Sequence, residues 1–252
     1  MSNLDNTINF ISELSSGYDS VVVYSSTLQL ARANNANADE IAKLFVDKLI
    51  RAIPGKTILM PTFSSGYDSK NLLSLDTSKS TTGLITEYFR THPSTQRTIS
   101  AFFSFGVQGY QSDDLLRLQP SEAWGKNSLY EWIHINNSLI LTVGLNPTHC
   151  SFTHYAEFLN QDIINYRMKK TVSGKVLLRG TIRELEETLL VRHTKPPAKN
   201  DFTWLAPHYE SAGQRIKLAG EVLVSGISAQ DKMAVVLPFV KKNPYALVKK
   251  EE

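Results

Sequence analysis

The sequence predicts an α/β fold in which a mainly parallel central sheet is flanked by helices, with antiparallel strands in the C-terminal half. Short apolar runs bounded by turn residues occur at 20–24, 57–60 and 139–145, and such runs are typical of buried parallel strands. An amphipathic segment at 39–52 separates the first two runs, which gives the strand–helix–strand order of a parallel sheet with crossover connections. We expect one domain that spans residues 1–252.

The N-terminal half alternates between expected helices and expected strands. Residues 3–14 place apolar side chains at helical spacing, and Asp39 is a candidate cap for the helix at 39–52. Pro54 and Gly55 end that helix. The remaining elements expected before the strand at 139–145 are helices at 81–90, 111–119 and 129–133 and an extended apolar segment at 97–106.

The C-terminal half continues with a helix at 154–160 and then with segments of alternating polarity. Alternation predicts half-buried strands. The antiparallel strands expected on this basis are 164–168, 175–178 and 181–191. The last elements expected are a basic, proline-bearing loop at 193–201, a helix at 202–212, a hairpin at 216–225 and a helix at 229–241 capped by Ser228.

Composition excludes several classes of protein. With 42% hydrophobic and 20% charged residues, the 252-residue chain can bury a sizeable core and is not globally disordered. A net charge of +3 is too small for a dedicated nucleic-acid binder, and a single cysteine excludes an intrachain disulfide and a cysteine-based zinc site. No apolar run approaches ~18 residues, and no signal peptide is recognisable. We therefore expect a soluble, cytoplasmic protein that binds neither nucleic acid nor membranes.

A polar loop after the strand at 139–145 holds the reactive side chains His149, Cys150 and His154. Ligands in α/β sheets bind at the carboxyl ends of the strands, so this loop is the first candidate for a site. The spacing of the two histidines beside Cys150 does not indicate a metal site, and we predict none. Of the three side chains, His154 is the strongest candidate for chemistry.

Several segments together resemble one known family. They read Tyr-Ser-Ser-Thr-Leu at 24–28, Gly-Lys-Thr-Ile-Leu-Met-Pro-Thr-Phe at 55–63, Arg-Thr-Ile-Ser-Ala-Phe-Phe-Ser-Phe-Gly from residue 97, Trp-Gly-Lys at 124–126 and Phe-Thr-His-Tyr-Ala-Glu at 152–157. Their order and spacing resemble the aminoglycoside 3-N-acetyltransferases, antibiotic N-acetyltransferases that lack the common GNAT acetyltransferase fold. The similarity covers most of the chain and includes Tyr166, Arg167 and Lys170.

The resemblance implies acyl transfer, with acetyl the expected group, from a coenzyme A thioester to the amine of a sugar. In the family a histidine at the position of His154 activates the acceptor amine, and a carboxylate orients that histidine. An ammonium cannot attack a thioester, so a base that works near neutral pH is required, and histidine suits this task. The candidate carboxylates are Glu157, one turn further along the same expected helix, and Asp201, whose other reading is a helix cap.

A second group of residues is expected to contact the cofactor. Hydroxyl groups just past the first strand could bind coenzyme A or the oxyanion of the intermediate, and basic side chains could bind the coenzyme A phosphates. The candidates are Tyr24, Ser25, Ser26, Thr27, Arg97, Ser104, Lys126 and Ser128.

Two departures from the family pattern bear on the acceptor. Tyr24 stands where the family usually has histidine, and Ser100-Ala101 stands where it has His-Pro. Aminoglycosides are polycations, whereas this chain is net positive and carries Arg192, Lys195 and Lys199 around one loop. On this argument the sequence favours a neutral or anionic acceptor, such as a nucleotide-linked amino sugar of polysaccharide biosynthesis. The alternative acceptor is an aminoglycoside, with antibiotic resistance as the role.

Two readings from other classes stay open. The changes at Tyr24 and Ser100-Ala101 also fit an inactive relative that binds coenzyme A or a sugar without turnover. Cys150 beside His149 fits a cysteine hydrolase, although free cysteines are most often buried apolar residues. The sequence does not predict the oligomeric state.

Overall fold

The computed structural model describes residues 2–65, 67, 71–193 and 198–250 and is built on a seven-stranded sheet. The strands, in the order in which they lie side by side, are β10 (Arg215–Ala219), β11 (Val222–Ser228), β6 (Leu139–Val143), β1 (Ser20–Ser25), β2 (Thr57–Pro61), β5 (Phe105–Gln108) and β4 (Gln96–Arg97). The central strands β6, β1 and β2 are parallel, and the outer strands pair antiparallel on both sides. The predicted α/β class is confirmed, and antiparallel pairing extends to the N-terminal edge as well.

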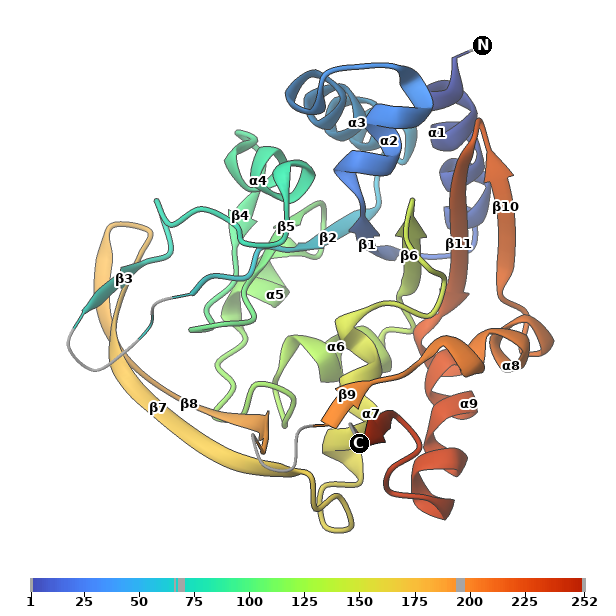
Figure 1. The fold of residues 1–252 in the computed structure, drawn as a ribbon. Coiled ribbons are helices and arrows are strands. Elements are labelled where there is room, and N and C mark those ends of the chain that lie inside the picture. The colour runs from blue at the N-terminus through green and yellow to red at the C-terminus, as the bar shows by residue number, and fades with distance from the viewer. Residues whose placement is uncertain (1, 66, 68–70, 194–197, 251–252) are drawn as a thin grey trace.

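Helices cover both faces of this sheet (Figure 1). One face packs against α1 (Asn3–Ser15), α2 (Thr27–Asn34), α3 (Ala38–Ala52) and α4 (Leu84–Thr91). The other face packs against α5 (Ser112–Arg117), α6 (Leu129–Ile135), the 3₁₀ turn η1 (Ser151–Thr153), α7 (His154–Leu159), the 3₁₀ turn η2 (Thr203–Leu205), α8 (Ala206–Ser211) and α9 (Ala229–Lys242). Val22 and Val23 show the alternation, because consecutive strand residues enter opposite cores.

A long antiparallel ribbon extends from the body on the side of the second helical layer (Figure 1). Its strands are β7 (Arg167–Leu178) and β8 (Thr181–Arg192), and the short strand β3 (Leu72–Ser74) adds to its far end. At the tip, the Asp76 carboxylate accepts hydrogen bonds from the backbone N–H groups of Arg179 (2.6 Å) and Gly180 (3.0 Å). Both turn residues have positive φ, which explains the glycine. The tip of the ribbon is therefore held by hydrogen bonds to Asp76 in the loop after β3.

The expected strand at 175–178 and the last two residues of the one expected at 164–168 belong to a single strand, β7, whose twelve residues all pair with β8, and residues 164–166 precede it. Sequence alternation weakens between them, because most of the ribbon is exposed on both faces and has no apolar side to maintain. The loop expected at 193–201 contains a further strand, β9 (Ala198–Asn200), which pairs with β12 (Val248–Lys250). Residues 194–197 of that loop lie outside the described residues.

Three other expectations needed correction. The segment after β1 forms α2, a helix that the sequence analysis did not predict, with Ser26 as its N-cap. The extended segment expected at 97–106 is divided into β4 and β5 by a loop. The helix expected at 202–212 is the turn η2 followed by α8, because Pro207 starts a new helix rather than continuing one.

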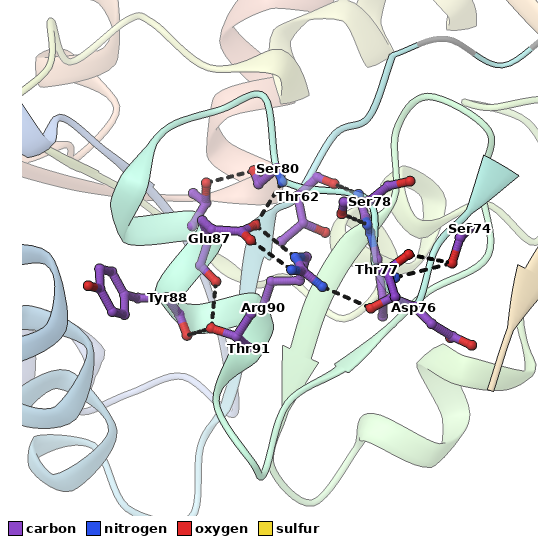
Figure 2. A network of polar contacts seen from close by, with 12 residues as sticks. Thr62, Ser74, Asp76, Thr77, Ser78, Ser80, Glu87, Tyr88, Arg90 and Thr91 are labelled. Atoms are coloured by element: carbon purple, nitrogen blue, oxygen red, sulfur yellow. Dashed lines mark hydrogen bonds and ion pairs between the residues drawn. The ribbon is translucent and has the colours of Figure 1, made fainter. Parts of the chain in front are cut away.

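A polar network ties the loop after β3 to α4. Figure 2 shows Arg90 between the carboxylate of Glu87 and the backbone of Asp76. The distances are 2.7 Å from Nη2 of Arg90 to Oε1 of Glu87 and 3.1 Å from Nη1 to the Asp76 carbonyl oxygen. The backbone N–H of Ser80 donates to the second oxygen of Glu87 at 2.8 Å.

Among the described helices, none is long and apolar enough to cross a membrane.

Candidate active site

The segment that leaves β6 turns through η1 into α7, and three hydroxyl groups hold it in place. Ser151 Oγ lies 3.1 Å from the phenol oxygen of Tyr24 and 3.1 Å from that of Tyr130. Both phenols are buried, and burial raises the pKa of each above its usual value, so both remain neutral. This contact seats η1 against the sheet three residues before His154.

His154 opens α7, and Glu157 follows one turn later on the same face of the helix. Nδ1 of His154 lies 2.5 Å from Oε2 of Glu157. The Glu157 side chain is fully buried, whereas 19% of the His154 side chain is exposed. The helix therefore presents an imidazole at the surface and holds its orienting carboxylate beneath it.

Glu157 is charged although no water reaches it. Tyr166 donates its phenol hydrogen to Oε1 at 2.6 Å, and Nη2 of Arg167 lies 2.8 Å from Oε2. Burial raises the pKa of the Glu157 carboxyl, but His154, Arg167 and Tyr166 together outweigh burial and lower the pKa to about 2. A carboxylate that is ionised in this way can only accept hydrogen bonds.

The ionised carboxylate assigns the tautomer of His154. Because Glu157 can only accept, Nδ1 of the imidazole carries a hydrogen, and Nε2 is the nitrogen that has the free lone pair in the neutral ring. Nε2 lies 3.4 Å from the side-chain amide nitrogen of Asn200, and the ring of Phe202 packs edge-on at 5.5 Å. The partly exposed nitrogen is thus the one able to take a proton from a substrate.

Asp201 does not orient His154 in this structure. Its carboxylate binds Nζ of Lys249 at 2.9 Å and the hydroxyl of Thr203 at 2.9 Å. Of the two candidate carboxylates, Glu157 is the one that contacts His154. The contact with Thr203 favours the second reading of Asp201, a residue that holds the start of the next helical turn.

Four residues around His154 were missed as site residues: Tyr166, Arg167, Asn200 and Phe202. Tyr166 and Arg167 lie at the start of the ribbon, and Asn200 and Phe202 lie at or just after β9, which is 46 residues from His154 at Asn200. Tyr166 and Arg167 lay in a segment that resembles the family, and Asn200 and Phe202 flank the suspected Asp201. Those two signals were present but did not show which side chains would meet at His154.

The hydroxyl residues expected to contact cofactor lie together at the carboxyl ends of β1 and β6. Ser26 caps α2, and its backbone N–H donates to the Val143 carbonyl at 2.9 Å. Thr27 Oγ1 accepts from the backbone N–H of Ile85 at 3.4 Å. Ser25 Oγ is shielded from solvent and has no hydrogen-bond partner among the described residues. Tyr24, by contrast, points beneath η1.

Arg97 and Ser104 lie inside the protein. The Arg97 guanidinium donates to Ser104 Oγ (2.9 Å) and to the carbonyl oxygens of Leu75 (3.1 Å), Ser78 (2.8 Å) and Thr62. Burial lowers the pKa of Arg97 to about 10, which leaves it charged at neutral pH. With its donors used on these oxygens, Arg97 is placed for a structural role rather than for a coenzyme A phosphate.

Ser100 and Ala101, which replace the family's His-Pro, bind a buried carboxyl group. Ser100 Oγ donates to Oε1 of Glu187 at 2.8 Å, and the Ala101 N–H donates to Oε2 at 2.9 Å. Burial raises the pKa of Glu187, and the donors from this loop oppose that effect. The departure from the family pattern therefore anchors the loop between β4 and β5 to strand β8.

The remaining candidates lie apart from His154 or do not face it. Ser128 is buried as the N-cap of α6, and Lys126 is exposed just before that helix. Cys150 is buried, with its sulfur 3.6 Å from the Thr153 hydroxyl. Lys195 lies outside the described residues. In the described part of the chain, no group of three or more His, Cys, Asp or Glu side chains could hold a metal ion.

A histidine in contact with a buried carboxylate, on a helix that follows a strand of an α/β sheet, is an arrangement suited to the removal of a proton from a nucleophile. A model of the aminoglycoside 3-N-acetyltransferase family matches residues 35–237. The chain belongs to this family, and the protein is an acyl-CoA-dependent N-acyltransferase. A comparison with curated protein sequences gave no match.

Solved structures share the fold over nearly the whole chain. They include the YokD protein from Bacillus subtilis (18% identity, TM-score 0.73, 94% of this chain and 93% of that one). AAC-IIIb in a binary complex with CoASH has 16% identity, a TM-score of 0.74 and coverage of 96% and 97%. AAC-VIa bound to sisomicin has 18% identity, a TM-score of 0.74 and coverage of 96% and 98%. At these identities the likeness establishes the shared fold.

Proposed function

We propose that the protein transfers an acetyl group from acetyl-coenzyme A to an amino group of an aminoglycoside, with His154 as the general base. The observation that carries the proposal is the His154–Glu157 pair: a buried, ionised carboxylate at 2.5 Å fixes a hydrogen on Nδ1 and leaves Nε2 as the nitrogen available to a substrate. This pair sits in a chain whose residues 35–237 match the family model.

The side chains divide the proton transfer between them. Nε2 of His154 accepts a proton from the acceptor amine as the amine attacks the thioester carbon. Glu157 keeps the imidazole in the tautomer that leaves Nε2 free and interacts favourably with the imidazolium that forms. When the carbon–sulfur bond breaks, the leaving thiolate takes the proton from Nε2, and the base returns to its starting state.

The residues present fit a coenzyme A thioester, which supplies an acyl group that is already activated. The shielded hydroxyl of Ser25 lacks a partner among the described residues, and Ser26 and Thr27 follow it at the start of α2. Unpaired polar atoms in such a place are suited to bind a ligand. AAC-IIIb, which shares the fold, is known with CoASH bound. We assign these three residues to cofactor binding.

The acceptor favoured from net charge needs correction. The match to the aminoglycoside 3-N-acetyltransferase family supports the alternative acceptor better than a nucleotide-linked amino sugar of polysaccharide biosynthesis. Of the neighbours in fold, AAC-VIa is described as bound to sisomicin. A net charge of +3 is summed over all 252 residues and says little about one pocket.

The test is thiol release from acetyl-coenzyme A in the presence of single acceptors. Purified protein is assayed with gentamicin, with kanamycin and with a nucleotide-linked amino sugar, each beside a sample without acceptor. We expect thiol release with an aminoglycoside, and His154→Ala as the matched control should lower it by about 10²–10⁴. Release with the nucleotide-linked sugar alone would contradict the proposed acceptor.

The same assay tests the reading as an inactive relative. That reading predicts binding of coenzyme A without thiol release for any amine. Binding is measured by calorimetry on the same preparation, so that a lack of turnover is not mistaken for a lack of folded protein. Turnover that depends on His154 would exclude an inactive relative.

A further inference from the structure

We propose that Arg167 is a positioning residue that keeps His154 an uncharged base between turnovers. The guanidinium binds the same oxygen of Glu157 that holds the imidazole, and its Nη2 lies 3.1 Å from Nδ1 of His154. This inference deepens the proposed function, because it concerns the regulation of the same base.

Two hydrogen-bond donors meet at one acceptor atom. Oε2 of Glu157 lies 2.5 Å from Nδ1 of His154 and 2.8 Å from Nη2 of Arg167. Since Nδ1 carries a hydrogen, it cannot also accept one from Arg167, and the 3.1 Å contact is an approach of two donors. Arg167 and His154 therefore share one carboxylate oxygen, which has a lone pair for each of them.

The contact that Arg167 makes with Glu157 changes how strongly Glu157 favours protonation of the imidazole. Glu157 alone would favour a protonated imidazole, because a fully buried carboxylate in contact with a histidine stabilises its cation. Arg167 already neutralises that carboxylate, and its own positive charge stands next to the ring. An added proton on Nε2 is thus less favoured than it would be beside Glu157 alone.

The guanidinium is fixed firmly enough to exert this effect. Its side chain is 7% exposed, and Nη1 donates to the Leu190 carbonyl on the neighbouring strand at 3.2 Å. Arg167 is the first residue of β7 and pairs in register with Arg192, the last residue of β8. The first residue of the ribbon therefore places a positive charge beside the first residue of α7.

The other groups packed around His154 do not replace this charge. Tyr166 donates to the second oxygen of Glu157, and Asn200 and Phe202 are uncharged. Asp201 is paired with Lys249 at 2.9 Å. Arg192, which pairs with Arg167 across the ribbon, has the same sign but is exposed, so water screens its charge. Removal of Arg167 consequently leaves Glu157 to act on the imidazole with little opposition.

Acyl transfer needs an imidazole that is uncharged before the amine attacks and that gives up its proton after the attack. An imidazole already protonated at working pH cannot accept a proton from the amine. After attack, an imidazolium held less tightly passes its proton to the leaving thiolate more readily. Arg167 supports both halves of the cycle without touching either substrate.

The test is the imidazole titration of His154 in the protein without substrates, followed by NMR in wild type and in Arg167→Gln and Arg167→Lys. Gln keeps a side-chain N–H donor but has no charge, and Lys keeps the charge without the fork. We expect the midpoint to move to higher pH by about one unit or more in Arg167→Gln and to stay near wild type in Arg167→Lys. Lys175→Met, which removes an exposed charge from the same strand, should not move it.

The acid limb of the kcat/KM profile should follow the titration in each variant that turns over substrate. An unchanged midpoint in a folded Arg167→Gln would overturn the proposal, and so would an equal shift in Arg167→Lys. If Arg167→Gln fails to fold, Arg167→Lys at wild-type midpoint supports the role of charge, and a raised midpoint contradicts it. The titration needs no acceptor, so it can fail or succeed independently of the proposed function.

Discussion

The carboxylate of Glu157 lies directly below the imidazole of His154, with 2.5 Å between Oε2 and Nδ1. Both residues belong to the short helix α7, so their relation is set by one turn of helix rather than by distant packing. His154 itself lowers the pKa of that carboxylate most, and Arg167 and Tyr166 at the start of the ribbon lower it further.

Replacing His154 by Ala should remove the base and leave the rest of the protein intact. The ring is partly exposed and fills no closed part of the core, so the fold and coenzyme A binding are expected to persist. Turnover should fall by about 10²–10⁴, the usual contribution of general base catalysis. Steady-state kinetics and calorimetry with coenzyme A measure the two effects. Full activity in this variant would rule out the role of His154.

Glu157→Gln should lower activity. It should also remove part of the increase in the free energy of unfolding that the wild type shows as pH rises. The pKa of Glu157 is about 2, below the ordinary value of 4.5, so its ionisation stabilises the folded state above about pH 4.5. That contribution is lost as pH falls from about 4.5 towards 2. Urea unfolding of wild type and Glu157→Gln between pH 3 and pH 7 should therefore give curves that converge at the acid end. Parallel curves would contradict the assigned ionisation.

The sequence could predict what depends on neighbouring residues. The apolar runs at 20–24 and 139–145, the helix that starts at His154 and the pairing of His154 with Glu157 all follow from local pattern. The contacts of Arg167 and Asn200 with His154 could not be predicted, because they depend on how the ribbon and the β9 segment fold back. Arg97 shows the same limit, because the sequence around an arginine does not tell whether its side chain will be buried or exposed.

Arg97 should prove to be a structural residue. Arg97→Ala leaves the carbonyl oxygens of Leu75 and Ser78 without their donor in the interior, whereas the Thr62 carbonyl keeps the Ser104 hydroxyl as a donor. Each unsatisfied buried group costs roughly 1–3 kcal/mol, so we expect a loss of about 3 kcal/mol or more in the free energy of unfolding. Arg117→Ala is the matched control, since that side chain is 75% exposed, and it should change stability by no more than about 0.5 kcal/mol.

The Arg97 variants also test the expected contact with coenzyme A. If the residue acts only through the fold, the folded fraction of Arg97→Lys should bind coenzyme A with wild-type affinity. Calorimetry at a temperature well below the unfolding midpoint measures this directly. A large loss of affinity with little loss of stability would instead assign Arg97 to the phosphates.

Cys150→Ser should be tolerated, because the structure gives the thiol no part in the chemistry. The side chain is 5% exposed, its sulfur contacts the Thr153 hydroxyl at 3.6 Å, and the base His154 is engaged with Glu157 instead. A cysteine hydrolase would lose turnover when its nucleophile is removed. We expect Cys150→Ser to retain thiol release from acetyl-coenzyme A, with only the modest destabilisation that follows when a hydroxyl replaces a buried thiol. Loss of turnover in a folded variant would return Cys150 to the list of catalytic candidates.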